Sequence, residues 1–253
     1  MIESTDYQII PKKRPVFTNW LNIILTIAFF GVFIFAMAYD EFFDDIFISA
    51  AVILFVLGSI LNSLLEAYIF RMRWQALADQ TGLEYYPQSR SIFKQPSLMG
   101  NRHGYVTKLA TFTRGSGKSR RHYTRFSFIL PFENAETFSI KKRGLLDGRD
   151  VKIGMEDVDK TFTIRASTPH MVHRIFQSNR LRQSLFDLVR QSKKMNLEVT
   201  ANELIFTEPN RIMDVEYLAA LHDFLHKICE SVKLSSAMQE GRSQEMASEK
   251  NPG

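Results

Sequence analysis

Two long apolar runs near the N-terminus constrain this chain more than any other feature. They cover residues 20–38 and 46–65, and neither contains an ionisable side chain. At about 1.5 Å per residue, a helix of either length spans a hydrocarbon core of about 30 Å. A backbone in lipid must satisfy its own hydrogen bonds, so we expect both runs to be helices. The sequence therefore predicts a transmembrane hairpin over residues 20–66.

The charges around the two runs predict their orientation. The connection 39–45 (YDEFFDD) is acidic and holds no Lys or Arg. Basic residues flank the hairpin on its other side, at Lys12, Lys13, Arg14, Arg71 and Arg73. Basic residues are retained on the cytoplasmic side. We therefore expect a multi-pass protein of the cell membrane with both termini cytoplasmic. A signal peptide is the competing interpretation of the first run, but that run is long for one and a second follows at once.

The apolar runs are typical of an anchor and not of a transport path, because a path would place charged groups inside the membrane. Residues 1–66 hold three basic and seven acidic residues, so the net charge of +5 over the whole chain leaves +9 for residues 67–253. A basic surface suits anionic lipid headgroups or an acidic partner. Cys229 is the single cysteine, which excludes an intrachain disulfide and fits a reducing compartment.

Hydrophobic periodicity predicts an α+β domain over residues 67–234, mainly an antiparallel sheet with two helices. A cytoplasmic segment over 1–19 precedes the hairpin, and a disordered tail over 235–253 follows the domain. The second span should continue as a helix to residue 80, with Gly82 as its cap. Expected strands or hairpins cover 83–87, 97–113, 122–132, 137–141, 151–153, 161–165 and 197–206. Expected helices cover 169–191 and 214–232.

A basic cluster is the strongest candidate binding surface. It comprises Arg114, Lys118, Arg120, Arg121 and Arg125, with Lys141, Lys142 and Arg143 expected beside them across a sheet. We expect contact with anionic headgroups or an acidic protein partner, and a solvated loop is the alternative. Nucleic acid is disfavoured because no binding motif accompanies the charge. The run 115–119 (GSGKS) is not expected to bind nucleotide, because the first glycine of a phosphate loop and the helix after it are both missing.

Histidine spacing raises one further possibility. His222 and His226 are four residues apart, as two zinc ligands on a helix can be, but no third ligand is placed. Cys229 follows one turn later, without a residue pattern that assigns it to catalysis. The sequence therefore assigns no catalytic residue, no metal ligand and no cofactor.

Short motifs in residues 70–208 resemble a loose group of uncharacterised prokaryotic membrane proteins. They are W-x-x-L-A at 74–78, T-G-L at 81–83, G-x-x-x-G at 100–104, V-x-I-G at 151–154, D-x-x-F-x-I at 159–164 and R-x-x-L at 182–185. Those proteins often carry Phe-Asp where this chain has Val158-Asp159. The resemblance implies two N-terminal transmembrane helices, a cytoplasmic α+β domain and an unassigned role.

Two classes of function remain at this stage. The first is a membrane-anchored binding or scaffolding module that contacts a protein partner or an anionic lipid surface. The alternative is a membrane-associated enzyme, such as a hydrolase acting at the lipid surface. The absence of clustered titratable groups in the sequence favours the module. A homo-oligomer is compatible with either class.

Overall fold

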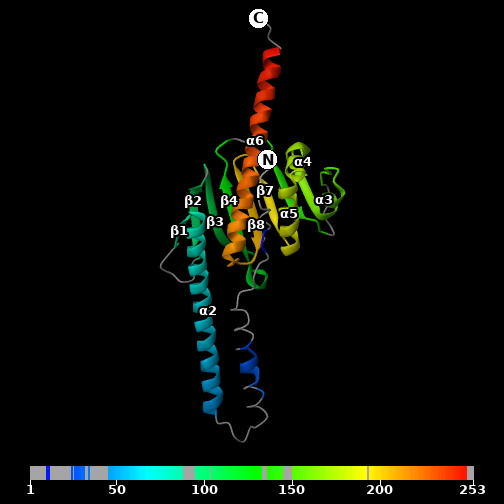
Figure 1. Cartoon of the computed structure of the whole chain (residues 1–253). Coiled ribbons are helices and arrows are strands. Elements are labelled where there is room, and N and C mark those ends of the chain that lie inside the picture. The colour runs from blue at the N-terminus through cyan, green and yellow to red at the C-terminus, as the bar shows by residue number, and fades with distance from the viewer. Residues whose placement is uncertain are drawn as a thin grey trace, which may run out of the picture.

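The computed structural model describes residues 10–11, 24, 26–31, 34, 45–87, 95–102, 104–132, 136–144, 150–192 and 194–249. It contains an α+β domain above a long helix that extends away from it (Figure 1). This confirms the α+β class and the mainly antiparallel sheet.

One eight-stranded antiparallel sheet organises the domain. Its strands are β1 (Glu84–Tyr86), β2 (Ser97–Arg102), β3 (Tyr105–Arg114), β4 (Arg121–Ile129), β5 (Phe138–Lys142), β6 (Phe162–Ala166), β7 (Asn196–Val199) and β8 (Glu203–Pro209). Their spatial order is β1-β2-β3-β4-β8-β7-β5-β6. The hairpins predicted from alternation are present, with Gly104 at φ +84° in the first turn. Gly100 and Asn101 lie in β2 and not in that turn, because the strand continues to Arg102.

Helix α2 (Asp45–Thr81) is one continuous helix whose two halves lie in different environments. Its first half exposes large apolar side chains such as Ile53, Leu57 and Leu61, whereas Phe70, Trp74 and Leu77 are buried against the domain. The helix ends at Thr81, the following Gly82 has φ +71°, and the N–H of Leu83 donates to the oxygen of Ala78. This is the expected glycine cap of a helix C-terminus.

Within the described residues, α2 is the one helix long and apolar enough to cross a membrane, over Phe55–Thr81. The first predicted span lies largely outside the described residues, so a two-helix hairpin and a multi-pass topology are not shown. The described part of that first run is helical in backbone, and the ring of Phe29 lies 4.2 Å from that of Phe55, centroid to centroid.

The helices differ from the sequence expectation in three places. The predicted helix 169–191 is divided into α4 (Pro169–Gln177) and α5 (Asn179–Gln191), because Ser178 leaves the helical conformation and accepts the N–H of Leu181. A short helix α3 (Glu156–Thr161), which the apolar pattern does not indicate, precedes β6. The expected strand 151–153 is absent, although Val151 donates one backbone hydrogen bond to Ile164.

Helix α6 (Val215–Glu249) is capped by the preceding Asp214, whose carboxylate accepts the N–H of Tyr217. It continues to Glu249, whereas a disordered tail is expected after residue 234. A helix propagates cheaply once it is nucleated, and residues 235–249 contain no proline and several good helix formers. We infer that residues 235–249 are helical because they extend the packed first half of α6.

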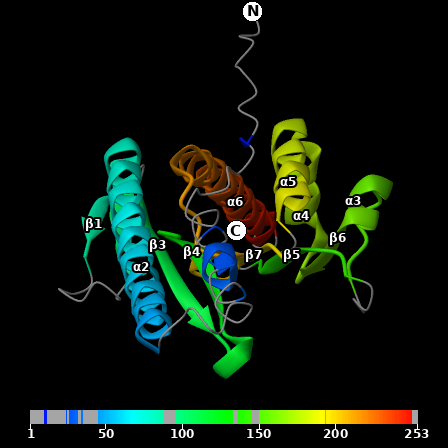
Figure 2. The same ribbon diagram turned by 90° about the horizontal axis from the view of Figure 1, so that it is seen from below.

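All the long helices lie on one face of the sheet. Figure 2 shows α2, α6, α5 and α4 along the same side of the strands. The side chains between these layers are large and fully buried, among them Phe126, Phe128, Phe162, Phe176 and Phe206. The ring of Phe162 lies 5.4 Å from that of Phe176, as the spacing of strand and helix residues predicts. No helix in the described ranges covers the opposite face of the sheet, which we call the outer face.

Candidate functional site

The basic cluster begins at the tip of the β3–β4 hairpin. Arg114 and Arg121 are register partners there, and all four tip cations are exposed: Arg114, Lys118, Arg120 and Arg121. The chain between the strands turns at Gly115, where a Cβ would lie 2.6 Å from the oxygen of Ser119. Like charges directly opposite each other destabilise a sheet. An anion bound at this tip would relieve that repulsion.

The hairpin tip lies at the level where the apolar part of α2 ends. In both views β3 runs from the buried end of α2 toward its apolar end (Figures 1 and 2). Desolvation lowers the pKa of Arg211, Glu66 raises it, and Arg120 lowers it. Glu66 is the first ionisable residue after the apolar run of α2. Arg211 and Arg120 therefore lie close to the predicted boundary between hydrocarbon and headgroups.

His122 lies close to Arg211 and to Arg120 of the hairpin tip. Burial lowers the pKa of its imidazole, and the cations Arg211 and Arg120 lower it further. Its Nδ1 is 3.2 Å from the hydroxyl oxygen of Thr113 on the paired strand. The imidazole is therefore held neutral at pH 7, and the positive charge of the tip comes from the arginines and Lys118. The sequence gives no signal for Arg211, because it is an isolated cation in the segment between β8 and α6.

The other predicted basic residues are only partly united with the tip. Arg125 and Lys141 lie on the same cross-strand row of the outer face, joined through Thr207 and Asn196. The Nζ of Lys142 instead bonds the oxygen of Val189, near the C-terminus of α5. Arg143 pairs with Asp150 and bonds the oxygen of Phe162. Lys142 and Arg143 therefore have intramolecular roles. Lys142 and Lys141 are separated because neighbouring strand residues point to opposite faces.

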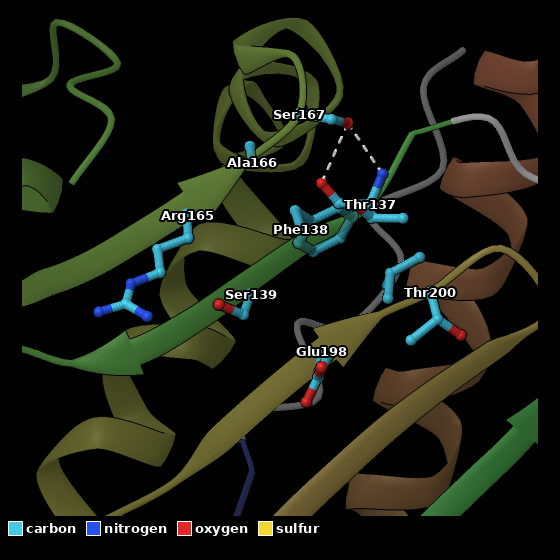
Figure 3. Close-up of a pocket in the computed structure, with 9 residues that line it drawn as sticks. Thr137, Phe138, Ser139, Arg165, Ala166, Ser167, Glu198 and Thr200 are labelled. Atoms are coloured by element: carbon cyan, nitrogen blue, oxygen red, sulfur yellow. Dashed lines mark hydrogen bonds between the residues drawn. The ribbon is translucent and has the colours of Figure 1, made fainter. Parts of the chain in front are cut away.

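A pocket opens on the outer face at the β5–β6–β7 end of the sheet. Its volume is about 430 Å³, and its charged lining residues are Arg165 and Glu198, with Ser139 between them (Figure 3). Ser167 closes one end by bonding both the N–H and the oxygen of Thr137. The sequence gives no signal for this pocket, because its three strands come from distant parts of the chain.

Of the two histidines spaced four apart, His222 lies inside the domain, as does Cys229, whereas His226 is partly exposed. His222 is 1% exposed and lies beside the rings of Phe126 and Phe128, with ring centroids 6.3 Å and 5.4 Å away. The imidazole of His222, whose Nδ1 lies 3.5 Å from Oδ1 of Asp223, lowers the pKa of that carboxyl. Cys229 is fully buried, and burial raises the pKa of its thiol, so the reactive thiolate is disfavoured. No group of three or more potential metal ligands occurs in the described part of the chain.

No protein-family model matches the chain, and no curated protein sequence matches it. One solved structure with a similar arrangement is the mycobacterial trehalose monomycolate transport factor A. It is 11% identical, with a TM-score of 0.38, over 62% of this chain and 94% of that one. A likeness of this size carries no argument about fold or function.

Proposed function

We propose that this protein is a membrane-anchored binding module whose α+β domain contacts anionic lipid headgroups through the basic hairpin tip. In this proposal the apolar run over residues 20–38 pairs with α2 to form a two-helix anchor, and both termini lie in the cytoplasm. The tip cations are the contact residues. An acidic protein partner at the same tip is the competing occupant.

The continuity of α2 carries the proposal. Its exposed apolar half and its half buried in the domain belong to one helix, so the domain cannot move away from the surface that its anchor enters. In this proposal the tip lies at the headgroup level, because Arg211 is close enough to interact with both Arg120 of the tip and Glu66, the first ionisable residue after the apolar run. Each Lys or Arg near an anionic leaflet contributes about 1 kcal/mol, so four tip cations contribute about 4 kcal/mol. Salt should weaken this contact, since the Debye length is only about 8 Å at physiological ionic strength.

The test places an environment-sensitive fluorophore at the tip of the full chain in lipid nanodiscs. Ser119→Cys supplies the attachment point, and the native Cys229 is buried from the reagent. We expect a blue shift when 30% of the lipid is anionic, compared with zwitterionic lipid alone. A label at Asn202→Cys, in the β7–β8 turn at the opposite end of the strands, should not respond.

Charge removal identifies the residues responsible. Replacing Arg114, Lys118, Arg120 and Arg121 by Gln should abolish the blue shift, and 0.5 M salt should reduce it. Lys233→Gln, an exposed cation on α6, is the matched control and should leave the shift intact. A tip label with identical emission in both lipids would overturn the headgroup assignment.

A further inference from the structure

The outer face carries an unusual order of charges along one cross-strand row. The row is continuous across all eight strands and reads Glu84, Met99, Lys108, Ser127, Ile205, Glu198, Ser139, Arg165. Its charges are negative, neutral, positive, neutral, neutral, negative, neutral and positive. When the row is turned end for end about its centre, between β4 and β8, each negative residue lies opposite a positive residue of the original row. The row is therefore electrostatically self-complementary.

We propose that the outer face binds the outer face of a second copy of this chain, about a two-fold axis parallel to the strands between β4 and β8. An isologous contact of this kind uses the same surface on both subunits. It places Lys108 of one copy against Glu198 of the other, and Glu84 against Arg165. Ser127 meets Ile205 near the axis, where this row carries no charge.

The pocket fits this arrangement. Its lining residues Ser139, Glu198 and Arg165 occupy one half of the row. The two-fold operation places over them the second copy's Met99, Lys108 and Glu84, all three of which are exposed in the single chain. A hollow on one half of the face thus lies opposite exposed side chains of the other half. The free space of about 430 Å³ is then occupied by the second copy and not by a small molecule.

The size and chemistry of the face suit a dimer contact. Eight strands spaced about 4.8 Å apart and about six residues long cover roughly 700 Å², compared with about 800 Å² per partner in a standard interface. Exposed apolar side chains lie beside the charged row: Val106 is 37% exposed and Ile129 is 52% exposed. Contact would remove these from water, and two twisted sheets pack face to face with their strands within about 30°.

The geometry is also compatible with two anchors in one membrane. Strand β3 runs roughly along α2 in both views (Figures 1 and 2). A two-fold axis parallel to the strands therefore directs α2 of both copies to the same side. The helices lie on the far face of each sheet, so neither α2 nor α6 obstructs the contact.

Charge reversal tests the proposal on the full chain in detergent, with the oligomeric state measured by sedimentation. We expect a dimer whose dissociation constant rises at least tenfold in Lys108→Glu and in Glu198→Lys, and returns to near the wild-type value in the double variant. Within one chain these two residues are three strand spacings apart, about 14 Å, so rescue requires a second copy. Lys233→Glu is the matched control, and its dissociation constant should equal that of the wild type.

Two results would overturn the dimer. One is a wild-type chain that is monomeric at about 10 μM, and the other is a double variant no tighter than the weaker single variant. Neither result bears on the hairpin tip, because its readout is the fluorescence at position 119. Conversely, loss of the lipid response with an intact rescue would refute the headgroup contact and leave the dimer standing.

Discussion

The indole N–H of Trp74 donates a hydrogen bond to the main-chain oxygen of Ile212, 3.1 Å away. Trp74 lies on α2, and Ile212 lies in the segment that leads from β8 into α6. The neighbouring Arg73 bonds the oxygen of Met213, so two consecutive residues of α2 hold this segment. The N–H of Ile212 is in turn bonded to the hydroxyl of Thr124 on β4. The anchor helix is therefore fastened to the sheet and to α6 at the same point.

Trp74→Phe should destabilise the domain by about 1–3 kcal/mol, because it keeps an aromatic ring but leaves the buried oxygen of Ile212 unsatisfied. Trp74→Ala should cost about 3–5 kcal/mol, since it also empties a fully buried site. Thermal unfolding of the full chain in detergent, followed by circular dichroism, measures both. Tyr68→Phe, at a 60%-exposed position on the same helix, is the control. Equal melting temperatures for Trp74→Phe and the control would contradict the role of the hydrogen bond.

Asp159 explains two of the short motifs that suggested a family resemblance. Its carboxylate accepts the N–H of Ile153 at 3.1 Å and that of Gly154 at 3.2 Å. Gly154 has φ +79°, a conformation that favours glycine. The motif around residues 151–154 and the motif that begins at Asp159 thus form one structural unit, a loop held by a carboxylate ahead of β6.

Asp159→Ala should destabilise the domain by about 2–4 kcal/mol, because it removes two hydrogen bonds to a charged acceptor. Asp159→Asn should cost less, since its remaining carbonyl oxygen can still accept one of the two N–H groups. Hydrogen exchange of residues 151–154, measured by mass spectrometry, should rise in the same order. Asp157→Asn, an exposed change in the same helix, is the control. Unchanged exchange in Asp159→Ala would show that the loop is held by other contacts.

Local patterns predicted most of the individual elements. The spacing of two between Phe126 and Phe128 places both side chains on the buried face of β4, and the glycine after Thr81 ends α2 as expected. The break at Ser178 was not predictable in this way, because the apolar stripe continues through it from Phe176 to Leu181. A helix interruption that preserves the buried face leaves no mark on the apolar pattern.

The candidate sites were only partly predictable, because they depend on strand order. Residues 141–143 are one run of basic residues in the sequence, yet Lys142 bonds α5 and Arg143 bonds β6 and Asp150. The row from Glu84 to Arg165 joins strands whose order along the sheet differs from their order in the chain. Periodicity specifies which face a residue occupies but not which strand lies beside it.

His122 should make stability fall at acidic pH. Its pKa is lowered in the folded chain, so the unfolded chain binds the proton more tightly. The free energy of unfolding therefore rises with pH through this group. The destabilisation due to His122 is complete below its folded-state pKa and absent above about 6.5, the ordinary pKa of histidine. We expect His122→Gln to flatten the dependence of the unfolding free energy between pH 7.5 and pH 5. His170→Gln, at an exposed position in α4, should retain the wild-type slope. Parallel slopes for all three chains would exclude His122 as the titrating group.

Phe162 is the residue on which the β6 side of the core depends. It is fully buried, and its ring lies 5.4 Å from that of Phe176 on α4 and 5.2 Å from that of Phe186 on α5. Phe162→Ala should cost about 3–5 kcal/mol, a large share of the roughly 5–15 kcal/mol that stabilises a typical domain. Phe162→Leu, which keeps more of the volume, should cost less. Hydrogen exchange should increase across β5, β6, α4 and α5, whereas the apolar half of α2 should keep its protection, since it does not pack on this core. A Phe162→Ala chain with wild-type exchange but altered binding would make Phe162 a recognition residue and would refute its structural role.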